Sequence, residues 1–192
     1  SFSQSGKRVI LVDCDMRRSI VHRFFGVKRA TGLSDYFLGT VKLEDCVRTA
    51  TDILTGELGW DRIVETTGLD HLALLTSGTR VPNPAELISP QHMSKLIERL
   101  RTEYDFVVID CPPVLPVTDA LVVGKYADAA FLVYQVGHTA RRALLRAKDE
   151  LTNAGVEVKG IVINQPNPSV KLGSAYYYQY SYSGSEDNPE SR

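Results

Sequence analysis

Five short runs of apolar residues predict buried strands, because each is rich in Val, Ile and Leu and shows no alternation with polar residues. These runs span residues 8–12, 72–75, 106–109, 130–134 and 158–163. Helical patterns lie between several of them, and strands that alternate with helices favour a parallel sheet. We therefore expect an α/β fold with a mostly parallel sheet flanked by helices.

The strongest helix signal begins at Ser89, a suitable N-cap that is followed by Pro90 at the first helical position. Apolar residues then recur at helical spacing, at positions 93, 96, 97 and 100. A second helix is expected to begin after Thr139, which would be its N-cap. It is expected to end at Gly155, in the left-handed conformation. Weaker helical signals cover residues 34–38 and 43–49.

Composition and charge exclude several classes of protein. A hydrophobic fraction of 43% over 192 residues is sufficient for one core. The net charge of −1 gives no reason to expect nucleic acid as a partner. No apolar run approaches the roughly 20 residues that cross a bilayer, so the segment itself is expected to be soluble. Its three cysteines, without C-x-x-C spacing, favour the reducing cytosol over a disulfide scaffold.

Acidic residues follow two of the predicted strands at their carboxyl ends, where open α/β sheets bind ligands. Asp13 and Asp15 come directly after the first strand, and Arg17 and Arg18 follow them. Carboxylates are suitable ligands for a hard cation, and guanidinium groups suit the phosphate oxygens of a cofactor. A capped turn with a solvent-facing ion pair would explain the same residues, so both interpretations stay open.

Asp110 ends the apolar run at residues 106–109, and the prolines at 112 and 113 prevent the strand from continuing. This is the Walker B arrangement, in which the carboxylate holds Mg²⁺ directly or through water. An Asx turn at the strand end is the alternative. Two such strand ends in one chain strengthen the metal interpretation, because parallel strands bring their carboxyl ends to the same edge of the sheet.

The composition changes after Lys171. Five of the nine tyrosines are concentrated within seven positions, and a polar, acidic end follows them. We therefore divide the chain into an α/β domain, residues 1–173, and a flexible tail, residues 174–192. The tyrosines suit phospho-acceptors, and an aromatic tail that docks in a neighbour's groove is the alternative. They are Tyr176, Tyr177, Tyr178, Tyr180 and Tyr182.

Taken together, these motifs resemble the cytoplasmic kinase domain of bacterial protein-tyrosine kinases (BY-kinases), which serve capsule and exopolysaccharide export. The resemblance covers nearly the whole chain and rests, in order, on VILVDCDMRRS, TGLSDYFLG, SGTRVPNPAELI, YDFVVIDCPPVLPVTDA, GIVIN and the tyrosine cluster. It implies a deviant P-loop NTPase architecture, similar to ParA and MinD, with a kinase-type nucleotide-binding domain over residues 1–173. It also implies an autokinase that uses ATP and Mg²⁺ to phosphorylate the clustered tyrosines, chiefly those of an adjacent subunit.

The resemblance also assigns roles to individual residues. Asp13 and Asp15 match the Walker A′ acids, which lie near Mg²⁺ and the attacking hydroxyl, and Asp13 is the best candidate to orient or deprotonate the phenol. Asp110 matches the Walker B acid on Mg²⁺. Asn164 matches the position that contacts adenine in the related ATPases, and a turn residue at the strand end is the alternative.

Partners and a location follow from the resemblance as well. The expected partners are a membrane activator or chain-length-determinant segment, on the same chain or a separate one, and further copies of the chain in a homo-oligomer. Enzymes of polysaccharide biosynthesis are the expected substrates. The expected location is the cytoplasmic side of the bacterial inner membrane.

One family motif is missing from this sequence. The phosphate loop G-x-x-x-x-G-K-[ST] does not occur, since the Gly-Lys pairs at residues 6–7 and 124–125 lack the required neighbours. In the family this loop, with its strand and helix, comes immediately before the segment that matches residues 1–12. We therefore expect that the chain, which begins at Ser1 rather than Met, is truncated and lacks the first strand of the fold.

Two other functions stay open on the sequence alone. A ParA- or MinD-type ATPase shares the Walker A′ and Walker B motifs, but it needs a basic surface or a basic amphipathic terminal helix, and the tyrosine tail supplies neither. A non-catalytic adaptor of polysaccharide export is the third possibility, because the phosphate loop is missing.

The remaining polar and sulfur-containing residues are expected to have ordinary structural roles. Cys14 and Cys111, each beside one of the acids, are expected to pack as small residues, with a redox pair as the alternative. The histidines show no metal-ligand spacing and are expected on the surface or in the core. They are His22, His71, His92 and His138.

Overall fold

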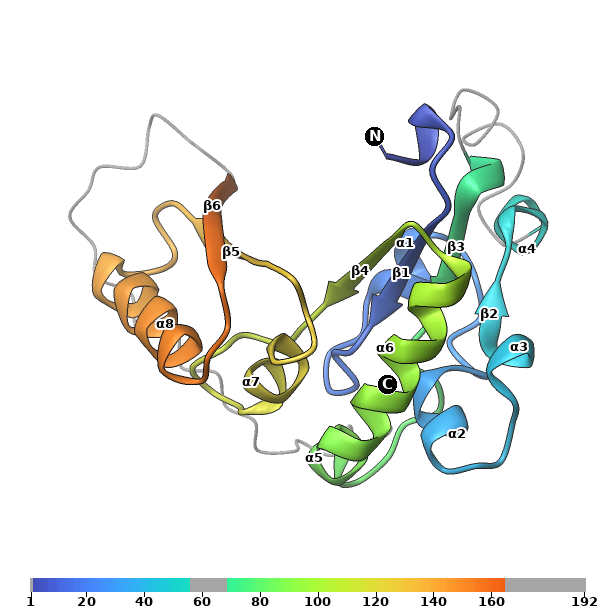
Figure 1. Cartoon of the computed structure of the whole chain (residues 1–192), viewed down its shortest axis with the longest axis horizontal. Coiled ribbons are helices and arrows are strands. Elements are labelled where there is room, and N and C mark those ends of the chain that lie inside the picture. Colours follow the sequence, from blue (N-terminus) through green and yellow to red (C-terminus); the bar gives the residue numbers. More distant parts are fainter. Residues whose placement is uncertain (1, 56–68, 165–192) are drawn as a thin grey trace, which may run out of the picture.

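The computed structural model describes residues 2–55 and 69–164, and its strands form two separate sheets (Figure 1). In the first sheet, with strand order β2-β3-β1-β4, β1 is parallel to both of its neighbours and β2 is antiparallel to β3. In the second sheet β5 and β6 are parallel. The strands are β1 (Val9–Asp13), β2 (Val47–Arg48), β3 (Leu72–Leu75), β4 (Phe106–Asp110), β5 (Ala130–Gln135) and β6 (Val158–Asn164).

Helices connect and cover these strands. The longer ones are α6 (Pro90–Glu103) and α8 (Arg141–Asn153), and α7 (Asp119–Gly124) contacts both of them. The shorter ones are η1 (Ser3–Ser5), α1 (Val21–Phe24), α2 (Leu33–Phe37), α3 (Leu43–Cys46), α4 (Ala50–Leu54), η3 (Leu69–His71) and α5 (Pro84–Leu87). Among the described residues, none of the helices combines the length and the apolar character needed to cross a bilayer.

The predicted α/β class is confirmed, and all five apolar runs form strands whose ends lie within one residue of those expected. The central strand explains why these runs lack alternation. Ile10 and Val12 of β1 belong to the same core as Leu96 of α6, whereas the intervening Leu11 packs with Ile53 of α4 on the other face. Because both faces of β1 are covered, every position in its centre favours an apolar residue.

The helix expected after Ser89 is confirmed as α6. The Ser89 hydroxyl accepts a hydrogen bond from the backbone N–H of His92, and Pro90 occupies the first turn, where its missing N–H costs nothing. The apolar residues at helical spacing form one buried face. At the end of α8, Gly155 follows the C-cap with φ +81°, as expected for a left-handed stop.

Two local predictions are wrong. Thr139 does not cap α8. The N-cap is Ala140, which makes no side-chain capping hydrogen bond, and Thr139 lies in the turn after β5, where its backbone N–H donates to the Gln135 carbonyl. The helical signal at 43–49 is only half correct, since α3 ends at Cys46 and the next two residues form β2. β2 pairs with the open side of β3, so long-range pairing overrides the local helical preference there.

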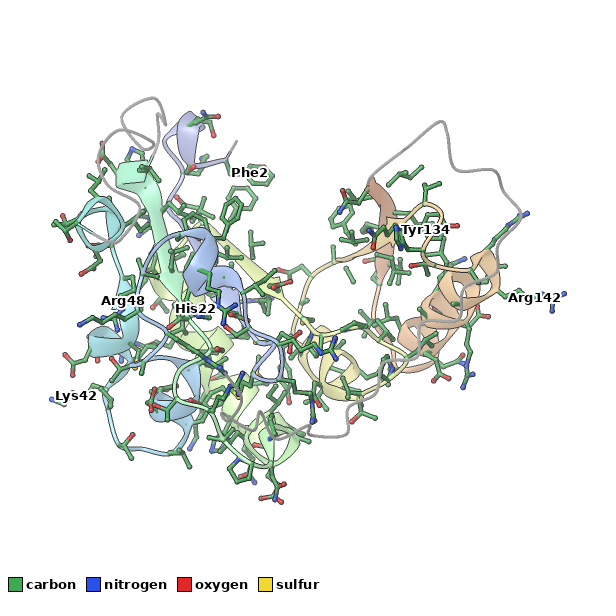
Figure 2. The ribbon with its side chains drawn as sticks, turned by 180° about the vertical axis from the view of Figure 1, so that it is seen from behind. Phe2, His22, Lys42, Arg48, Tyr134 and Arg142 are labelled. Carbon is green, nitrogen blue, oxygen red and sulfur yellow. The ribbon has the colours of Figure 1, made fainter. Side chains whose placement is uncertain are left out.

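The parallel sheet that the sequence predicts is divided between β4 and β5. β4 forms one edge of the first sheet, and β5 pairs with β6 alone among the described strands (Figure 1). Apolar side chains are consequently left uncovered: Val108 of β4 is 44% exposed, and Phe131 and Val133 of β5 are 63% and 67% exposed. Figure 2 shows the same separation from behind, with Phe2 beside the first sheet and Tyr134 in the second.

The turn after β3 is joined to α2 by a buried carboxylate. One oxygen of Asp35 accepts the backbone N–H groups of Gly32, at 2.8 Å, and Thr79, at 3.0 Å. These hydrogen bonds lower the pKa of Asp35 despite its burial. Gly78 lies between them with φ +83°, and a side chain there would collide with Ser34 and Asp35. This arrangement fixes the loop that follows β3, beside the candidate site.

Candidate active site

The two acidic strand ends meet, as the parallel topology predicts. Asp13 of β1 is paired in register with Asp110 of β4, and the backbone N–H of Cys14 donates to the Asp110 carbonyl at 2.8 Å. Carboxylates 97 positions apart in the sequence, at residues 13 and 110, therefore lie at one edge of the sheet. That edge is the ordinary place for a ligand in an open α/β sheet.

Asp13 is fully buried and held by two hydrogen bonds. Its Oδ1 accepts the backbone N–H of Asp15 at 3.1 Å, and its Oδ2 accepts the hydroxyl of Ser19 at 2.5 Å. Burial raises the pKa of Asp13 to about 6, and the charges of Asp110 and Asp15 add to this rise, while the two hydrogen bonds oppose it. The group is therefore mostly ionised above pH 7 and close to the range in which general bases work.

Asp15 shapes the loop that follows β1. Its Oδ1 accepts the backbone N–H groups of both Arg17, at 3.1 Å, and Arg18, at 2.8 Å. The capped turn, which was one of the two interpretations of these residues in the sequence, is thus present. It does not exclude a ligand, because a carboxylate has about four acceptor positions and these bonds use two of them.

Arg17 and α7 are joined by an ion pair that the sequence did not indicate. Arg17 Nε donates to Asp119 Oδ2 at 3.2 Å, and the Asp119 side chain is 2% exposed. Asp119 lies 102 positions further along the chain. The sequence motif VTDA contains Asp119, but no local pattern reveals which positively charged side chain pairs with it.

Asp110 lies on the uncovered face of β4 and is exposed. Even so, partial loss of water around the carboxyl group raises its pKa, and the charge of Asp15 raises it further. Asp13 and Asp110 thus both hold raised pKa values in a cluster of like charges. A divalent cation at this edge would relieve that repulsion, so the donor set fits Mg²⁺.

The described residues contain no group of three His, Cys, Asp or Glu side chains arranged to hold a metal ion by themselves. This finding is compatible with Mg²⁺, which is usually held by one or two carboxylates together with substrate phosphates and water. Asp13, Asp15 and Asp110 would accordingly hold Mg²⁺ only weakly without a nucleotide.

Three further residues at this edge were missed by sequence reasoning. Ser19 donates to Asp13, and its Oγ also lies 3.1 Å from Nδ1 of His22 on α1. Arg29 donates to the Met16 carbonyl at 3.0 Å and to the Ser77 hydroxyl at 3.1 Å, and so it joins the loops after β1 and β3. These side chains stand in weakly patterned segments, where only the folded chain shows their partners.

Cys14 and Cys111 occupy the positions after the two acids and are free thiols. Burial raises the pKa of Cys111 to about 12, and burial also raises the pKa of Cys14 well above its ordinary value. Since the thiolate is the reactive form, these groups are unreactive at neutral pH. This agrees with the packing role rather than with a redox pair.

Asn164 does not lie at this edge. Asn164 ends β6 in the second sheet, opposite Gln135, and Figure 1 shows that sheet apart from β1. Its contact with adenine stays a prediction. The predicted phospho-acceptors lie outside the described residues, as does the boundary at residues 173 and 174.

Known sequences that are similar to this chain include bacterial tyrosine-protein kinases. The AAA domain family matches residues 1–147. Tyrosine-protein kinase YwqD of Bacillus subtilis is 33% identical over 187 residues, which cover 97% of this chain and 69% of the relative. A putative tyrosine-protein kinase in the cps region of Klebsiella pneumoniae is also 33% identical, over 84% of this chain and 20% of the relative.

Solved structures agree with the sequence comparison. The kinase domain of Escherichia coli tyrosine kinase ETK matches with a TM-score of 0.76 and 29% identity, over 92% of this chain and 63% of that chain. MinD of Pyrococcus horikoshii, in complex with Mg-ADP, matches with a TM-score of 0.63 and 23% identity, which shows a shared fold alone. The chain thus spans a fifth to about two thirds of the length of these kinases. With its acidic strand ends in register and nearly its whole length aligned, the chain belongs to the bacterial tyrosine-protein kinases.

Proposed function

We propose that this chain is the phosphoryl-transfer domain of a protein-tyrosine autokinase that regulates capsular or exopolysaccharide biosynthesis and export. Its acceptors are the clustered tyrosines 176, 177, 178, 180 and 182 of an adjacent subunit. The observation that carries the proposal is the register of Asp13 with Asp110 in a chain of this family, because it places two ionisable carboxylates at one ligand-binding edge.

Each acid has a role that follows from its surroundings. Asp13, ionised above its pKa of about 6, accepts the proton of the attacking phenol and orients it. Asp13, Asp15 and Asp110 would hold Mg²⁺ together with the phosphates of the nucleotide. Bound MgATP would supply the γ-phosphoryl group. Catalysis by these residues is therefore positioning and neutralisation of charge, as is general for phosphoryl transfer.

The arginines and Asn164 complete the proposed nucleotide site. Arg17 is anchored to Asp119, so its position after β1 is defined, and Arg18 follows it on the same turn. Both guanidinium groups suit phosphate oxygens. Asn164 is proposed to contact adenine once β6 stands beside the first sheet.

A phosphate-loop strand is proposed to fit between β4 and β5. Support comes from the division of the sheet at this place and from the exposed apolar side chains on the two strands that border it, Val108 and Val133 among them. A strand inserted there would satisfy both edges and cover these side chains. In the family such a strand precedes the segment that matches residues 1–12.

The partners and the location are proposed on the same basis. They are a membrane activator or chain-length-determinant segment, further copies of the chain, and enzymes of polysaccharide synthesis, at the cytoplasmic face of the inner membrane. Phosphorylation would add nearly two negative charges per tyrosine and so would loosen an oligomer in which the tails approach acidic edges.

The test uses the complete gene product, purified and incubated with MgATP. We expect phosphotyrosine, and we expect a G-x-x-x-x-G-K-[ST] motif in the gene upstream of the codon for Ser1. Release of phosphate without phosphotyrosine would support a MinD-type ATPase instead. Neither activity, together with absence of that motif, would support the adaptor.

A further inference from the structure

A chain of two hydrogen bonds joins α1 to the buried carboxylate at the end of β1. The Ser19 hydroxyl, buried, donates to Asp13 Oδ2 at 2.5 Å, and its oxygen lies 3.1 Å from His22 Nδ1. A serine hydroxyl has one hydrogen. Because that hydrogen is used toward Asp13, the hydrogen in the second bond must come from His22.

We infer that Ser19 and His22 are positioning residues for Asp13, with the His22 ring in the tautomer that carries its hydrogen on Nδ1. The chain of donors then runs in one direction, from His22 Nδ1–H to Ser19 Oγ–H to Asp13 Oδ2. Consecutive hydrogen bonds polarise one another, so the ring strengthens the bond that Ser19 makes to the carboxylate. The inferred hydrogen bonds do not depend on the proposed function, whereas their effect on catalysis by Asp13 rests on it.

The consequence concerns the orientation of the Asp13 carboxylate. Oδ1 is held by the backbone N–H of Asp15, and Oδ2 is held by Ser19. With one acceptor position on each oxygen used, the plane of the group is fixed, and each oxygen keeps a second lone pair. A carboxylate fixed before the substrate arrives does not have to lose rotational freedom in the transition state.

The surroundings of His22 are consistent with a neutral ring. Burial lowers its pKa, and the charges of Arg29 and Arg23 lower it further. At pH 8 the ring is therefore neutral and carries a single hydrogen, so its tautomer is a definite property. Figure 2 labels His22 on α1.

The tautomer is measured first, in the complete gene product with ¹⁵N in its histidine rings, at pH 8. We expect the His22 signals to show a protonated Nδ1 and an unprotonated Nε2, and Ser19→Ala to abolish this preference. His22→Asn identifies the signals by their loss. An Nε2–H ring in the unsubstituted protein would overturn the inference.

The kinetic consequence is tested with matched variants. His22→Asn places an amide N–H where Nδ1–H was and is expected to keep kcat within about threefold, whereas His22→Leu should lower kcat about tenfold with the KM for MgATP unchanged. Ser19→Thr keeps the hydroxyl and is expected to keep kcat within about threefold, whereas Ser19→Ala removes the hydroxyl and should lower kcat about tenfold. Equal losses in the Asn and Leu variants would overturn the positioning role. Absence of phosphotyrosine in the unsubstituted protein would refute the proposed function, and the ring measurement would still decide the hydrogen-bond chain.

Discussion

Arg17 and Asp119 form an ion pair that ties the loop after β1 to the first turn of α7, with 3.2 Å between Arg17 Nε and Asp119 Oδ2. The two side chains differ in burial, because Arg17 is 24% exposed and Asp119 is 2% exposed. Replacing Arg17 alone and replacing Asp119 alone should therefore lower the free energy of unfolding by different amounts. A buried carboxylate without its cation is costly, whereas a partly exposed guanidinium can turn to water.

We expect Arg17→Met to lower the free energy of unfolding by about 3 kcal/mol and Asp119→Leu to lower it by clearly less, because only the first leaves a buried charge unpaired. The double variant should be more stable than Arg17→Met alone. Urea denaturation of the complete gene product and of the three variants measures this. Equal losses in the two single variants would show that the pair does not hold a buried charge.

The three acids at the sheet edge are expected to be essential for activity and not for folding. Asp13→Ala, Asp15→Ala and Asp110→Asn should each lower the rate of phosphotyrosine formation by about 100-fold or more, since each removes a group placed at the reacting atoms. Far-ultraviolet circular dichroism should be unchanged. Asp128→Asn, at an exposed ion pair distant in sequence from the three acids, is the matched control and should keep its activity. Nearly normal activity in two of the three variants would contradict their placement at the reacting atoms.

Loss of water around Asp13 and Asp110, together with the repulsion between the acids, predicts a pH-dependent stability. The pKa values of Asp13 and Asp110 are raised in the folded protein, so their ionisation opposes folding: the penalty is absent below about pH 4 and complete above the folded pKa of Asp13, about 6. Asp110→Asn removes one charge and should therefore raise Tm at pH 8, and raise it by less at pH 5. Thermal unfolding at both pH values tests the sign. A gain in Tm at pH 5 that matches the gain at pH 8 would contradict the conclusion that ionisation of these acids opposes folding.

Much of this fold and part of the site could be predicted from the sequence, for identifiable physical reasons. The strands were predictable because β1, covered on both faces, tolerates only apolar residues in its centre. The meeting of Asp13 and Asp110 was predictable because parallel strands share their carboxyl edge. Ser19, Asp119 and the short strand β2 were missed, since their roles depend on partners that folding brings from elsewhere in the chain.

The uncovered strands β4 and β5 predict that residues 1–192 alone associate or fold poorly. Val108→Lys and Val133→Lys should reduce self-association of this chain, because both side chains are exposed in it, at 44% and 67%. In the complete gene product, where we expect a strand to cover them, the same changes should destabilise the fold. Leu145→Lys, at a residue of α8 that is 50% exposed, is the control and should have little effect in either form.

Sedimentation and thermal unfolding measure both effects. A sharp, reversible transition from a monomer of residues 1–192 would show that the sheet needs no further strand, and it would contradict this part of the account.

The most direct test of the central claim is to map phosphate in a mixture of two forms of the complete gene product, neither of which can phosphorylate its own tail. One form carries Asp13→Ala and keeps its tyrosines, and the other keeps Asp13 and has phenylalanine at positions 176, 177, 178, 180 and 182. With MgATP, mass spectrometry should find little phosphate on either form alone and phosphate on several of these tyrosines of the Asp13→Ala form in the mixture. Phosphate confined to Tyr36, Tyr104, Tyr126 or Tyr134 would contradict transfer from the Asp13 edge to the tail of another subunit. A mixture with no more phosphate than each form has alone would contradict it as well.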